Sequence, residues 1–583
     1  MSNDVEMNDV QKPLMKDSDI ENIPEVEFKS IKQDAEIVKK DDEFRGLTKE
    51  ELEKFAKDPF WVKLRLILFI LFWIVWATML VAAILIVVFS KKCPKRPKLE
   101  FWQQKTGYWV DPYAFVDTDQ NLVGDFKGIM TKLDYIQKKV GAGYIILNPV
   151  FKGQYIKENQ ISEFVEIFRN VDPKLGSIES FKELVKDARK RGIEIVLSVD
   201  LNSLSNSSKF MADLNLKSDS VLTEIKESIK IWLNYGVRGF LFTNLGMYAE
   251  NGTKPDRKCK NDSISSPYST IDVQMLLKEI RKTMDEVAKS TDKSRLLIVD
   301  AGNVGLEVGK ADPLLQYLGK KENLADMIIS REFLKYRGWE TECGNKQSSI
   351  SNYLSTVPSD KRKMVGLTST TLFSPRTNDL MKIVSPFLLE GNSILYYGSE
   401  VNMPCDGMDL SGSTLYPVNS KLPNNCNHMI MPWDNNGDEF SGGKLNQSQY
   451  LSQYKDTVQS LTATGTGENI LKLHGRLIKI RNEPSLLWGK TKLIQSQKTS
   501  NYSHNIFTRQ ADGFPIIVVA LLIDLTAEKP GKVFSFKSIC EKFTPILVYP
   551  SNENLEENKE VDTKNVFLKT VTTGSVHVFK CAE

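Results

Sequence analysis

Two carboxylic acids stand at the ends of strand-like segments, where they could form a catalytic pair. The segments GYIILNPV, IEIVLSVD, VRGFLFTN and RLLIVDAG bring Pro149, Asp200, Thr243 and Asp300 to, or close to, their C-terminal ends. Catalytic side chains of a barrel built from alternating strands and helices gather at those ends. A pair of carboxyl groups is the machinery of glycosidic bond cleavage. Asp200 and Asp300 are therefore the first candidates for chemistry.

Histidine-driven chemistry has little support in this sequence. The chain has four histidines among its 583 residues, and none precedes residue 428. A hydroxyl such as that of Thr243 needs an adjacent base to act as a nucleophile. The composition therefore weakens histidine-dependent and metal-dependent catalysis, and we expect neither a cofactor nor a metal site.

Alternating segments predict an α/β fold. Helix-like stretches precede the strand-like segments; SFKELVKDARKRG, for example, precedes IEIVLSVD. Repeated units of this length imply a parallel sheet, and their number favours a (β/α)8 TIM barrel, which we place at residues 105–485. Short β-rich runs separated by turn residues follow, including KVFSF and SVHVFK. They predict an antiparallel β domain over residues 486–583.

One apolar stretch predicts a single transmembrane helix. The 24 residues 66–89 include no charged side chain. At about 1.5 Å of rise per residue, such a helix is longer than a hydrocarbon core of roughly 30 Å. Soluble helices rarely stay apolar on every face, so we prefer a transmembrane helix to a buried core helix.

The segments on either side of this span have different characters. Residues 1–44 hold 13 Asp and Glu against 6 Lys, without sustained apolar periodicity, which indicates a disordered acidic tail. Residues 45–65 are predicted as a juxtamembrane helix, in which Asp58-Pro59 offers a second helix start. Residues 90–104 are predicted as a stalk.

Cysteines and glycosylation sequons favour one orientation in the membrane. Basic residues flank the span in similar numbers on both sides, so the positive-inside rule does not decide. All seven cysteines and all five N-x-S/T sequons follow the span, as expected for an oxidising compartment. We therefore predict a single-pass type II protein of the plasma membrane, with a cytoplasmic tail and an extracellular C-terminal domain. The sequons are at Asn206, Asn251, Asn261, Asn446 and Asn501.

The overall composition excludes several classes of protein. Hydrophobic residues make up 41% of the chain and charged residues 26%, which rules out a wholly disordered chain, a collagen and a polytopic membrane protein. The net charge of +3 results from 77 basic and 74 acidic side chains, so no nucleic-acid partner is expected. Membrane lipid is the expected surrounding of the span.

Five stretches after the span resemble the α-amylase clan of glycoside hydrolases, near the maltases. They lie at 124–151, 171–200, 236–243, 394–400 and 431–434, and they include GVRGFLFT, ILYYGSE and MPWD. The resemblance implies a (β/α)8 barrel followed by a β domain. Because 35 residues separate Asp200 from Gly236, there is no room for the domain that active maltases insert at this point.

The positions that would carry catalysis in this clan are changed. Of the motif D-x-x-x-N-H only the aspartate is present, and in the motif G-F-R-x-D leucine replaces the arginine and threonine replaces the nucleophilic aspartate. The position of the acid/base glutamate holds an aspartate, which is one methylene shorter. The resemblance therefore implies a barrel without glycosidase activity. In chain order these positions are Asp200, Leu204, Ser205, Leu241, Thr243 and Asp300.

The stretch that enters the membrane narrows the resemblance further. GLTKEELEKFAKDPFWVKLRLILFILFWIVW, with a cysteine soon after the span, is similar to the heavy chains of heteromeric amino-acid transporters of the 4F2 cell-surface antigen type. This resemblance covers about residues 46–583. It implies an ancillary subunit that brings a polytopic light chain to the cell surface and stabilises it there. A single span cannot form an alternating-access path, so transport would belong to the light chain.

The resemblance implies an interchain disulfide from Cys93 to the light chain, which would account for the odd number of cysteines. An unpaired thiol and a homodimer bridge are the alternatives for Cys93. The other six cysteines allow many pairings. Those we favour are Cys259 with Cys343, Cys405 with Cys426, and Cys540 with Cys581.

Small residues within the span could admit a partner helix. Ala77, Thr78 and Ala82 lie close together in the sequence, and small side chains let helix backbones approach closely in a membrane. Such residues also occur by chance at this frequency.

Two other functions remain open at this point. A membrane-anchored α-glucosidase is opposed by Ser205, Leu241 and Thr243. A cell-surface adhesion or signalling protein without a transporter partner is not excluded by any residue of the sequence.

Overall fold

A computed structural model describes most of the chain after its acidic tail. The described residues form two units, Met1–Lys92 and Cys93–Glu583, here called the N-terminal and C-terminal units. The described ranges are 49–89, 95–151, 168–199, 219–243, 270–300, 313–319, 324–330, 349–368, 380–403, 429–434, 438–442, 469–499, 502–524, 531–572 and 574–582.

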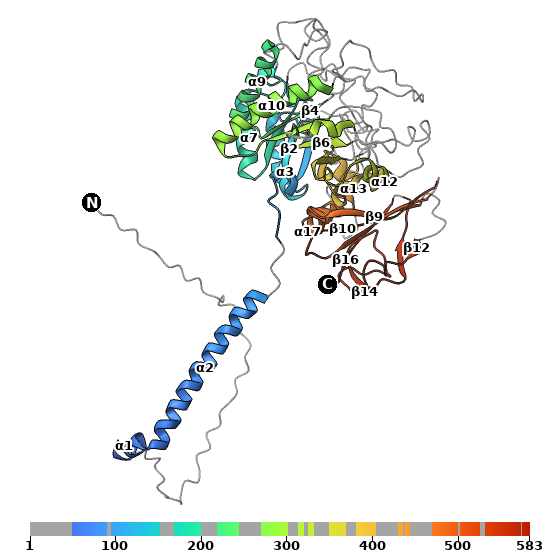
Figure 1. The fold of residues 1–583 in the computed structure, drawn as a ribbon. Helices are drawn as coiled ribbons and strands as arrows, with labels where there is room; N and C mark the ends of the chain where they lie inside the picture. Colours follow the sequence, from blue (N-terminus) through green and yellow to red (C-terminus); the bar gives the residue numbers. More distant parts are fainter. Residues whose placement is uncertain are drawn as a thin grey trace, which may run out of the picture. The chain divides into compact units, whose positions relative to one another are not determined.

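Two helices in the N-terminal unit meet at Asp58. α1 spans Lys49–Lys57 and α2 spans Pro59–Phe89 (Figure 1). Proline lacks an N–H donor and fits the first turn of a helix, and Asp58 Oδ1 accepts a hydrogen bond from the Phe60 N–H at 2.9 Å. This aspartate–proline pair therefore sets the start of the second helix.

The long helix α2 is apolar enough to cross a membrane, by its length and composition. Its 31 residues correspond to about 46 Å of helix. Residues 59–65 belong to α2, so the juxtamembrane helix predicted over residues 45–65 is divided at Asp58 instead of ending before residue 66. The long helix therefore starts at the Asp58-Pro59 cap and not at residue 66, where the side chains change from charged to apolar. Backbone capping, and not hydropathy, sets the end of a helix.

The small residues of the span lie on the surface of α2. Ala77, Thr78 and Ala82 are all exposed in this unit. The Thr78 hydroxyl donates a hydrogen bond to the Val75 carbonyl oxygen at 2.8 Å, so its polar group is satisfied within the helix. Whether a partner helix packs there stays a prediction.

Eight parallel strands form a closed barrel in the C-terminal unit, which confirms the predicted fold class. The strands pair in chain order, and β1 closes the ring against β8 through the pairs Gly107–Ile394, Tyr108–Leu395 and Trp109–Tyr396. The strands are β1 Thr106–Val110, β2 Ala142–Leu147, β3 Glu194–Val199, β4 Gly239–Thr243, β5 Leu296–Asp300, β6 Met327–Ser330, β7 Val365–Thr368 and β8 Asn392–Tyr396.

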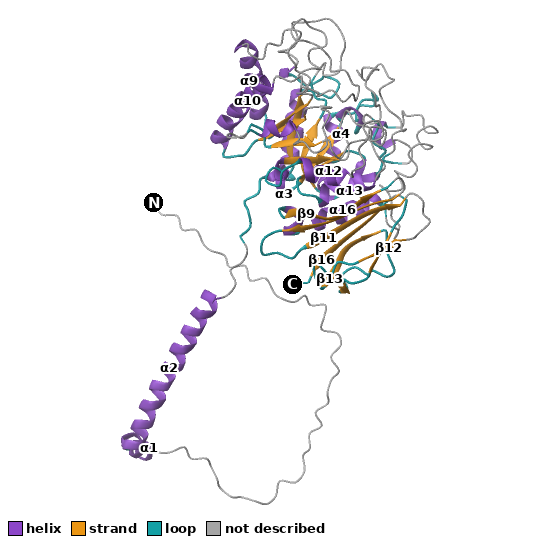
Figure 2. Cartoon of the chain, turned by 45° about the vertical axis from the view of Figure 1, so that its right-hand side comes forward, coloured by secondary structure: helices purple, strands orange, loops and turns teal. Residues whose placement is uncertain are grey.

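Helices connect these strands and lie around the barrel (Figure 2). α7 illustrates why they form: the Ser177 hydroxyl accepts a hydrogen bond from the Ser180 N–H at 3.2 Å and caps the helix. Its apolar side chains at Phe181, Leu184 and Ala188 recur at helical spacing and are buried. The helices are α4 Phe126–Thr131, α5 Leu133–Lys138, α7 Ile178–Lys190, α9 Asp219–Asn234, α10 Thr270–Thr291, α12 Ser349–Thr356 and α13 Leu380–Leu388.

An antiparallel β domain follows the barrel. Its six-stranded sheet has the order β14-β13-β16-β11-β10-β9, and a separate pair joins β12 to β15. Cys540 and Cys581 form a disulfide with their Cα atoms 6.0 Å apart. The strands are β9 Lys490–Lys498, β10 Tyr502–Gln510, β11 Ile517–Asp524, β12 Gly531–Phe534, β13 Lys542–Tyr549, β14 Val561–Asp562, β15 Val566–Lys569 and β16 Ser575–Cys581.

Two buried arginines stabilise the region where the barrel meets this domain. Arg509 on β10 donates to the carbonyl oxygens of Leu388, at the end of α13, and of Leu486 at 2.9 and 2.7 Å. Arg481, on helix α16 (Ile470–Arg481), donates to the carbonyl oxygens of Phe387 and Gly391 at 2.9 and 2.6 Å. The bonds to Phe387 and Leu388 satisfy carbonyl groups that the end of α13 leaves unpaired. Arg509 thereby joins the end of α13 to the β domain, and Arg481 joins α16 to the segment between α13 and β8.

Three histidines are buried in and beside the β domain. His474 on α16, His504 on β10 and His577 on β16 each expose 2% or less of their surface. Burial lowers the pKa of His474 and of His577 to about 4. Burial, and then Lys532, also lower the pKa of His504. All three are therefore neutral in the folded chain at pH 7.

We predict that acid destabilises the folded chain through these histidines. Below pH 6.5 the unfolded chain binds protons at each histidine, while folded His474 and His577 stay neutral until about pH 4. Each should therefore remove about 1.4 kcal/mol of unfolding free energy per pH unit across this window. Urea unfolding followed by tryptophan fluorescence measures the slope. The variants His474→Phe and His577→Phe should each flatten it; a slope that neither variant changes contradicts the prediction.

Candidate functional site

The C-terminal ends of the barrel strands bring two of the predicted residues together. Thr243 ends β4 and Asp300 ends β5, and the two residues are directly paired in the sheet. Thr243 is 1% exposed and its hydroxyl donates to the Val199 carbonyl oxygen at 3.5 Å. Asp300 is fully buried. This neighbouring pair therefore supplies one carboxyl group, whereas retaining glycosidic cleavage requires two.

Leu241 fills a position inside the barrel wall with an apolar side chain. It is fully buried on β4, between Ser198 on β3 and Ile298 on β5. A leucine there can contribute packing, but it can neither bind nor orient a carboxylate. No histidine occurs in the described strands of the barrel, so these strands also provide no imidazole base for the Thr243 hydroxyl.

Another buried carboxylate near the end of β8 is bound by tyrosines. Glu400 lies in the short helix η8 (Ser399–Val401) and accepts hydrogen bonds from the hydroxyls of Tyr108 and Tyr135 at 2.6 and 3.1 Å. Burial, and then the charge of Glu400, raise the pKa of Tyr135 well above its ordinary value. Tyr135 therefore stays protonated and donates to Glu400. The three side chains connect β1, α5 and η8, which is a structural role.

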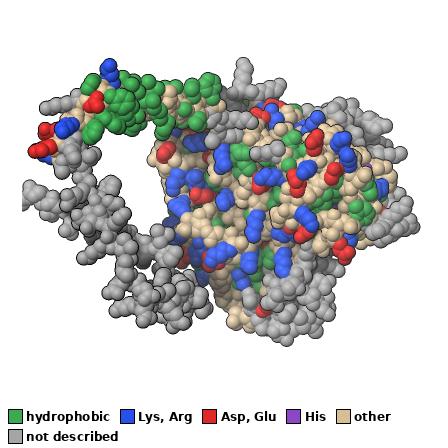
Figure 3. Space-filling view, turned by 90° about the horizontal axis from the view of Figure 1, so that it is seen from below, with side chains coloured by type: hydrophobic (Ala, Val, Ile, Leu, Met, Phe, Trp, Pro, Cys, Tyr) green, Lys and Arg blue, Asp and Glu red, His purple; other side chains and the backbone are tan. Residues whose placement is uncertain are grey.

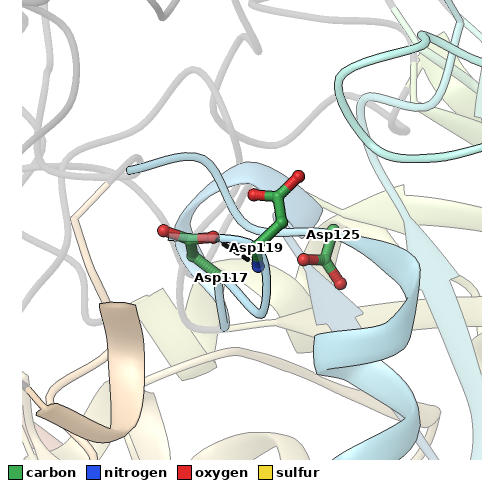
Figure 4. Close-up of side chains that lie close together, drawn as sticks. All are labelled: Asp117, Asp119 and Asp125. Atoms are coloured by element: carbon green, nitrogen blue, oxygen red, sulfur yellow. Dashed lines mark hydrogen bonds between the residues drawn. The ribbon is translucent and has the colours of Figure 1, made fainter. Parts of the chain in front are cut away.

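Three aspartates gather in the loop between β1 and α4. Asp117, Asp119 and Asp125 each offer a carboxylate oxygen within 4.8 Å of the others (Figure 4). Oxygen ligands of this kind suit hard divalent cations such as Ca²⁺. Sequence reasoning proposed no metal site and passed over these residues, although the repeated aspartates between positions 117 and 125 were visible.

Hydrogen bonds from the protein already occupy most of these carboxylate oxygens. Asp117 accepts from the Leu122 N–H and from the Ser441 hydroxyl, both at 2.8 Å. Asp125 caps α4 through the Gly128 N–H at 2.7 Å and accepts from the Thr118 N–H and hydroxyl at 2.7 Å. These bonds fold the loop after β1.

Asp119 differs from its two neighbours. Its side chain is exposed, and its carboxylate accepts one hydrogen bond in the described structure, from the Asn121 N–H at 3.3 Å. Desolvation, and then the neighbouring Asp117, raise the pKa of Asp119. Asp119 is therefore the member of the cluster whose negative charge is least balanced by hydrogen bonds. A bound cation would offset its repulsion from Asp117.

Many of the other predicted residues lie outside the described ranges. They include the first motif of the expected catalytic site, the interchain cysteine, four of the paired cysteines and all five sequons. These residues are Asp200, Leu204, Ser205, Cys93, Cys259, Cys343, Cys405, Cys426, Asn206, Asn251, Asn261, Asn446 and Asn501.

Two family models match this chain in succession. The model of the solute carrier family 3 member 2 N-terminus matches residues 31–108. The model of the α-amylase catalytic domain matches residues 109–212 and 203–489, which is more than half of the chain. The first match contains α2 and the start of β1, and the second contains the end of β1 and the strands β2 to β8.

Relatives of this chain include proteins named as amino acid transporter heavy chains and a maltase. The chain is 28% identical to the amino acid transporter heavy chain SLC3A2 of Oryctolagus cuniculus, over 76% of each chain. It is 25% identical to the amino acid transporter heavy chain SLC3A1 of Homo sapiens, over 82% of this chain and 78% of that one. Maltase A1 of Drosophila melanogaster is 22% identical over 74% of this chain and 88% of its own length.

Solved structures agree on the fold. The trehalose-6-phosphate hydrolase of Bacillus licheniformis superposes with a TM-score of 0.58 and 15% identity, and the match covers 83% of this chain and all of that one. At this identity the likeness shows an amylase-type architecture alone.

We predict that Asp125 and Asp119 differ in their importance for stability. Asp125→Ala removes a helix cap and two further hydrogen bonds, so it should lower the free energy of unfolding by about 2–3 kcal/mol. Asp119→Ala, the matched control, should cost less than about 1 kcal/mol. Urea unfolding of the two variants measures both values. Equal losses would contradict the assignment of Asp125 as the residue that folds the loop.

Proposed function

The chain belongs to the α-amylase family, and its residues 31–108 match the model of the solute carrier family 3 member 2 N-terminus. From this combination we propose that it is the heavy chain of a heteromeric amino-acid transporter. The observation that carries the proposal is one candidate membrane helix, α2, joined to an amylase-type barrel. Relatives that match 76% and 82% of this chain are named amino acid transporter heavy chains.

In this role the chain supports a second protein and does not itself transport. One helix cannot build a path with alternating access, so the polytopic light chain would hold the substrate route. The heavy chain would deliver this partner to the plasma membrane and stabilise it there. The tail would be cytoplasmic and the C-terminal unit extracellular, where the sequons could carry glycans and Cys93 could reach the partner.

The barrel in this proposal is catalytically inactive. Thr243 occupies the nucleophile position with a hydroxyl bonded to the Val199 carbonyl oxygen, and Leu241 replaces the arginine. Neither residue can form or stabilise a glycosyl ester of a carboxylate. The likeness to Maltase A1 makes α-glucosidase activity the competing function.

Maltose hydrolysis separates these two functions. We predict that the purified full chain releases no glucose above the buffer blank, because β4 provides neither a nucleophile nor the arginine. The same should hold for Thr243→Asp, which restores one carboxylate without the arginine. Glucose release that Asp300→Asn abolishes would show an active glycosidase and would overturn the inactive barrel.

An interchain disulfide is the most direct test of the partner. On a non-reducing gel, the full chain expressed in cells should migrate as a band with the summed mass of both chains, and reduction should return it to the heavy chain alone. Cys93→Ser should abolish the larger band. The matched control Cys540→Ser removes the disulfide within the β domain and should leave the larger band in place. A larger band that persists in Cys93→Ser would refute the proposed linkage.

A further inference from the structure

A two-stranded flap covers one face of the sheet in the β domain. We give this name to β12 and β15, which pair with each other and lie outside the six-stranded sheet. The side chains of Phe534, Val566 and Leu568 point inward and are buried in one apolar cluster with Val518 on β11 and Phe579 on β16. The flap therefore closes over a small hydrophobic core of its own.

Two buried histidines lie beneath the flap, one near each of its strands. The ring of His504 on β10 lies 5.4 Å from the ring of Phe534 on β12, measured between centroids. His577 Nε2 on β16 lies 3.2 Å from the carbonyl oxygen of Lys569, which ends β15. His504 is 2% exposed and His577 is fully buried. Both rings would gain contact with water if the flap moved away from the sheet.

The strand register places both histidines on the side of the sheet that faces the flap. Residues directly opposite each other on neighbouring antiparallel strands point to the same face. His504 pairs with Leu522, and His577 pairs with Ala520. Leu522 and Ala520 both belong to the apolar cluster that the flap completes. The two histidines therefore interrupt an apolar surface with groups that can bind protons.

The closed flap leaves polar atoms on this face unsatisfied. Neither ring nitrogen of His504 has a hydrogen-bond partner among the described residues, and the same holds for the Ser575 hydroxyl and for His577 Nδ1. Ser575 pairs with Leu522, so it shares the face with His504. Buried polar atoms without partners cost free energy, which hydration on opening would recover. Apolar packing therefore holds the flap closed against a polar penalty.

The groups around His504 oppose its protonation while the flap is closed. The Lys532 ammonium group on β12 lies 3.5 Å from the centroid of the Tyr502 ring, and that ring lies 5.5 Å from the ring of His504. Burial, and then Lys532, lower the pKa of His504. Burial, and then Asp524, raise the pKa of Tyr502 to about 12, so Tyr502 stays neutral. Movement of β12 would remove both the burial and the nearby cation.

Protonation of His577 is also unfavourable in the closed position. Burial lowers its pKa to about 4, although the Lys569 carbonyl oxygen acts in the opposite direction. The ring of Phe579 lies parallel to the imidazole with centroids 6.4 Å apart, and the Lys569 ammonium group donates to the Ser551 carbonyl oxygen at 3.4 Å. A second proton, on Nδ1, would meet no acceptor in the described part of the chain. The charged imidazole therefore requires water.

We propose that this flap is an acid-sensitive element, which opens locally between about pH 7 and pH 5 because His504 and His577 bind protons in the open position and not in the closed one. The inference does not depend on the transporter role. Histidine is the side chain that ordinarily changes its charge in this range.

Opening would add apolar surface to a molecule that displays much charge. Seen from below, the C-terminal unit shows many charged side chains, among which apolar ones are scattered (Figure 3). Phe534 and Leu568 would become exposed beside Val533, which is already 60% exposed in the closed flap. Contiguous exposed apolar side chains mark interaction sites. The open flap would therefore offer a binding surface that exists in acid.

The size of the effect follows from proton binding. An exposed histidine has a pKa of about 6.5, whereas His577 in the closed flap stays neutral until about pH 4. Between pH 7 and pH 5, His577 alone should therefore raise the ratio of open to closed flap by about 20-fold. His504 acts in the same direction, because its pKa is also lowered in the closed position.

Hydrogen exchange of the purified full chain in detergent micelles, followed by mass spectrometry at pH 7 and pH 5, tests the proposal. After correction for the intrinsic pH dependence of exchange, protection of the β12 and β15 peptides should fall by about 20-fold or more. At pH 5 these peptides should also be less protected than β11, because local opening precedes global unfolding. Flap peptides as protected as β11 at pH 5, or a fall below about threefold, would overturn the proposal.

Three variants identify the groups responsible. H504Q and H577Q remove one titrating ring each, so each should reduce the pH-dependent fall in flap protection. H474Q is the matched control, because His474 is a buried histidine on α16, outside the flap and its cluster; it should leave that fall unchanged. Protection of β11 at pH 7 shows that each variant is folded. A fall that neither H504Q nor H577Q reduces, or that H474Q reduces equally, would mean that the flap opens only with the whole chain, contrary to the proposal.

Discussion

Closure of β1 against β8 is the constraint on which the rest of this structure depends. A closed ring of parallel strands aligns every strand, so all C-terminal ends meet at one pole and all N-terminal ends at the other. The first pole contains Thr243 and Asp300, and the second contains Arg238 and Arg295. The two sets are a few residues apart in the sequence of β4 and β5, yet the barrel wall keeps them on opposite ends.

At the first pole, two positions that were expected to carry catalysis hold uncharged, buried side chains. A catalytic arginine or carboxylate inside a barrel must be paired or solvated, because an isolated buried charge is costly. Leu241 and Thr243 carry no such requirement: the leucine is fully buried and the threonine hydroxyl bonds to a strand carbonyl. In the proposed inactive barrel, these two residues would therefore stabilise the strands without the cost of keeping a charge buried.

The sequence predicted the features that depend on local pattern. The four strand-like segments predicted from the sequence correspond to β2, β3, β4 and β5, which are flanked by amphipathic helices. The strands β6 and β7 have four residues each, too few to show a period. The start of α2 at Pro59 was also visible, as the Asp58-Pro59 pair, although hydropathy alone would place the start of the span at residue 66. The burial of His504 under Phe534 could not be predicted, because only the fold brings β10 and β12 together.

The second pole of the barrel is held by contacts of its own. Enzymes of this fold work at the C-terminal ends of their strands, and the opposite pole ordinarily serves stability. Here the short helix α3 (Phe101–Gln104) packs on β1 and β2, and the ring of Phe101 lies 5.2 Å from the guanidinium carbon of Arg238, next to the start of β4. This packing does not involve the residues at the C-terminal ends of the strands. The barrel can therefore stay folded whichever side chains occupy the positions at the first pole.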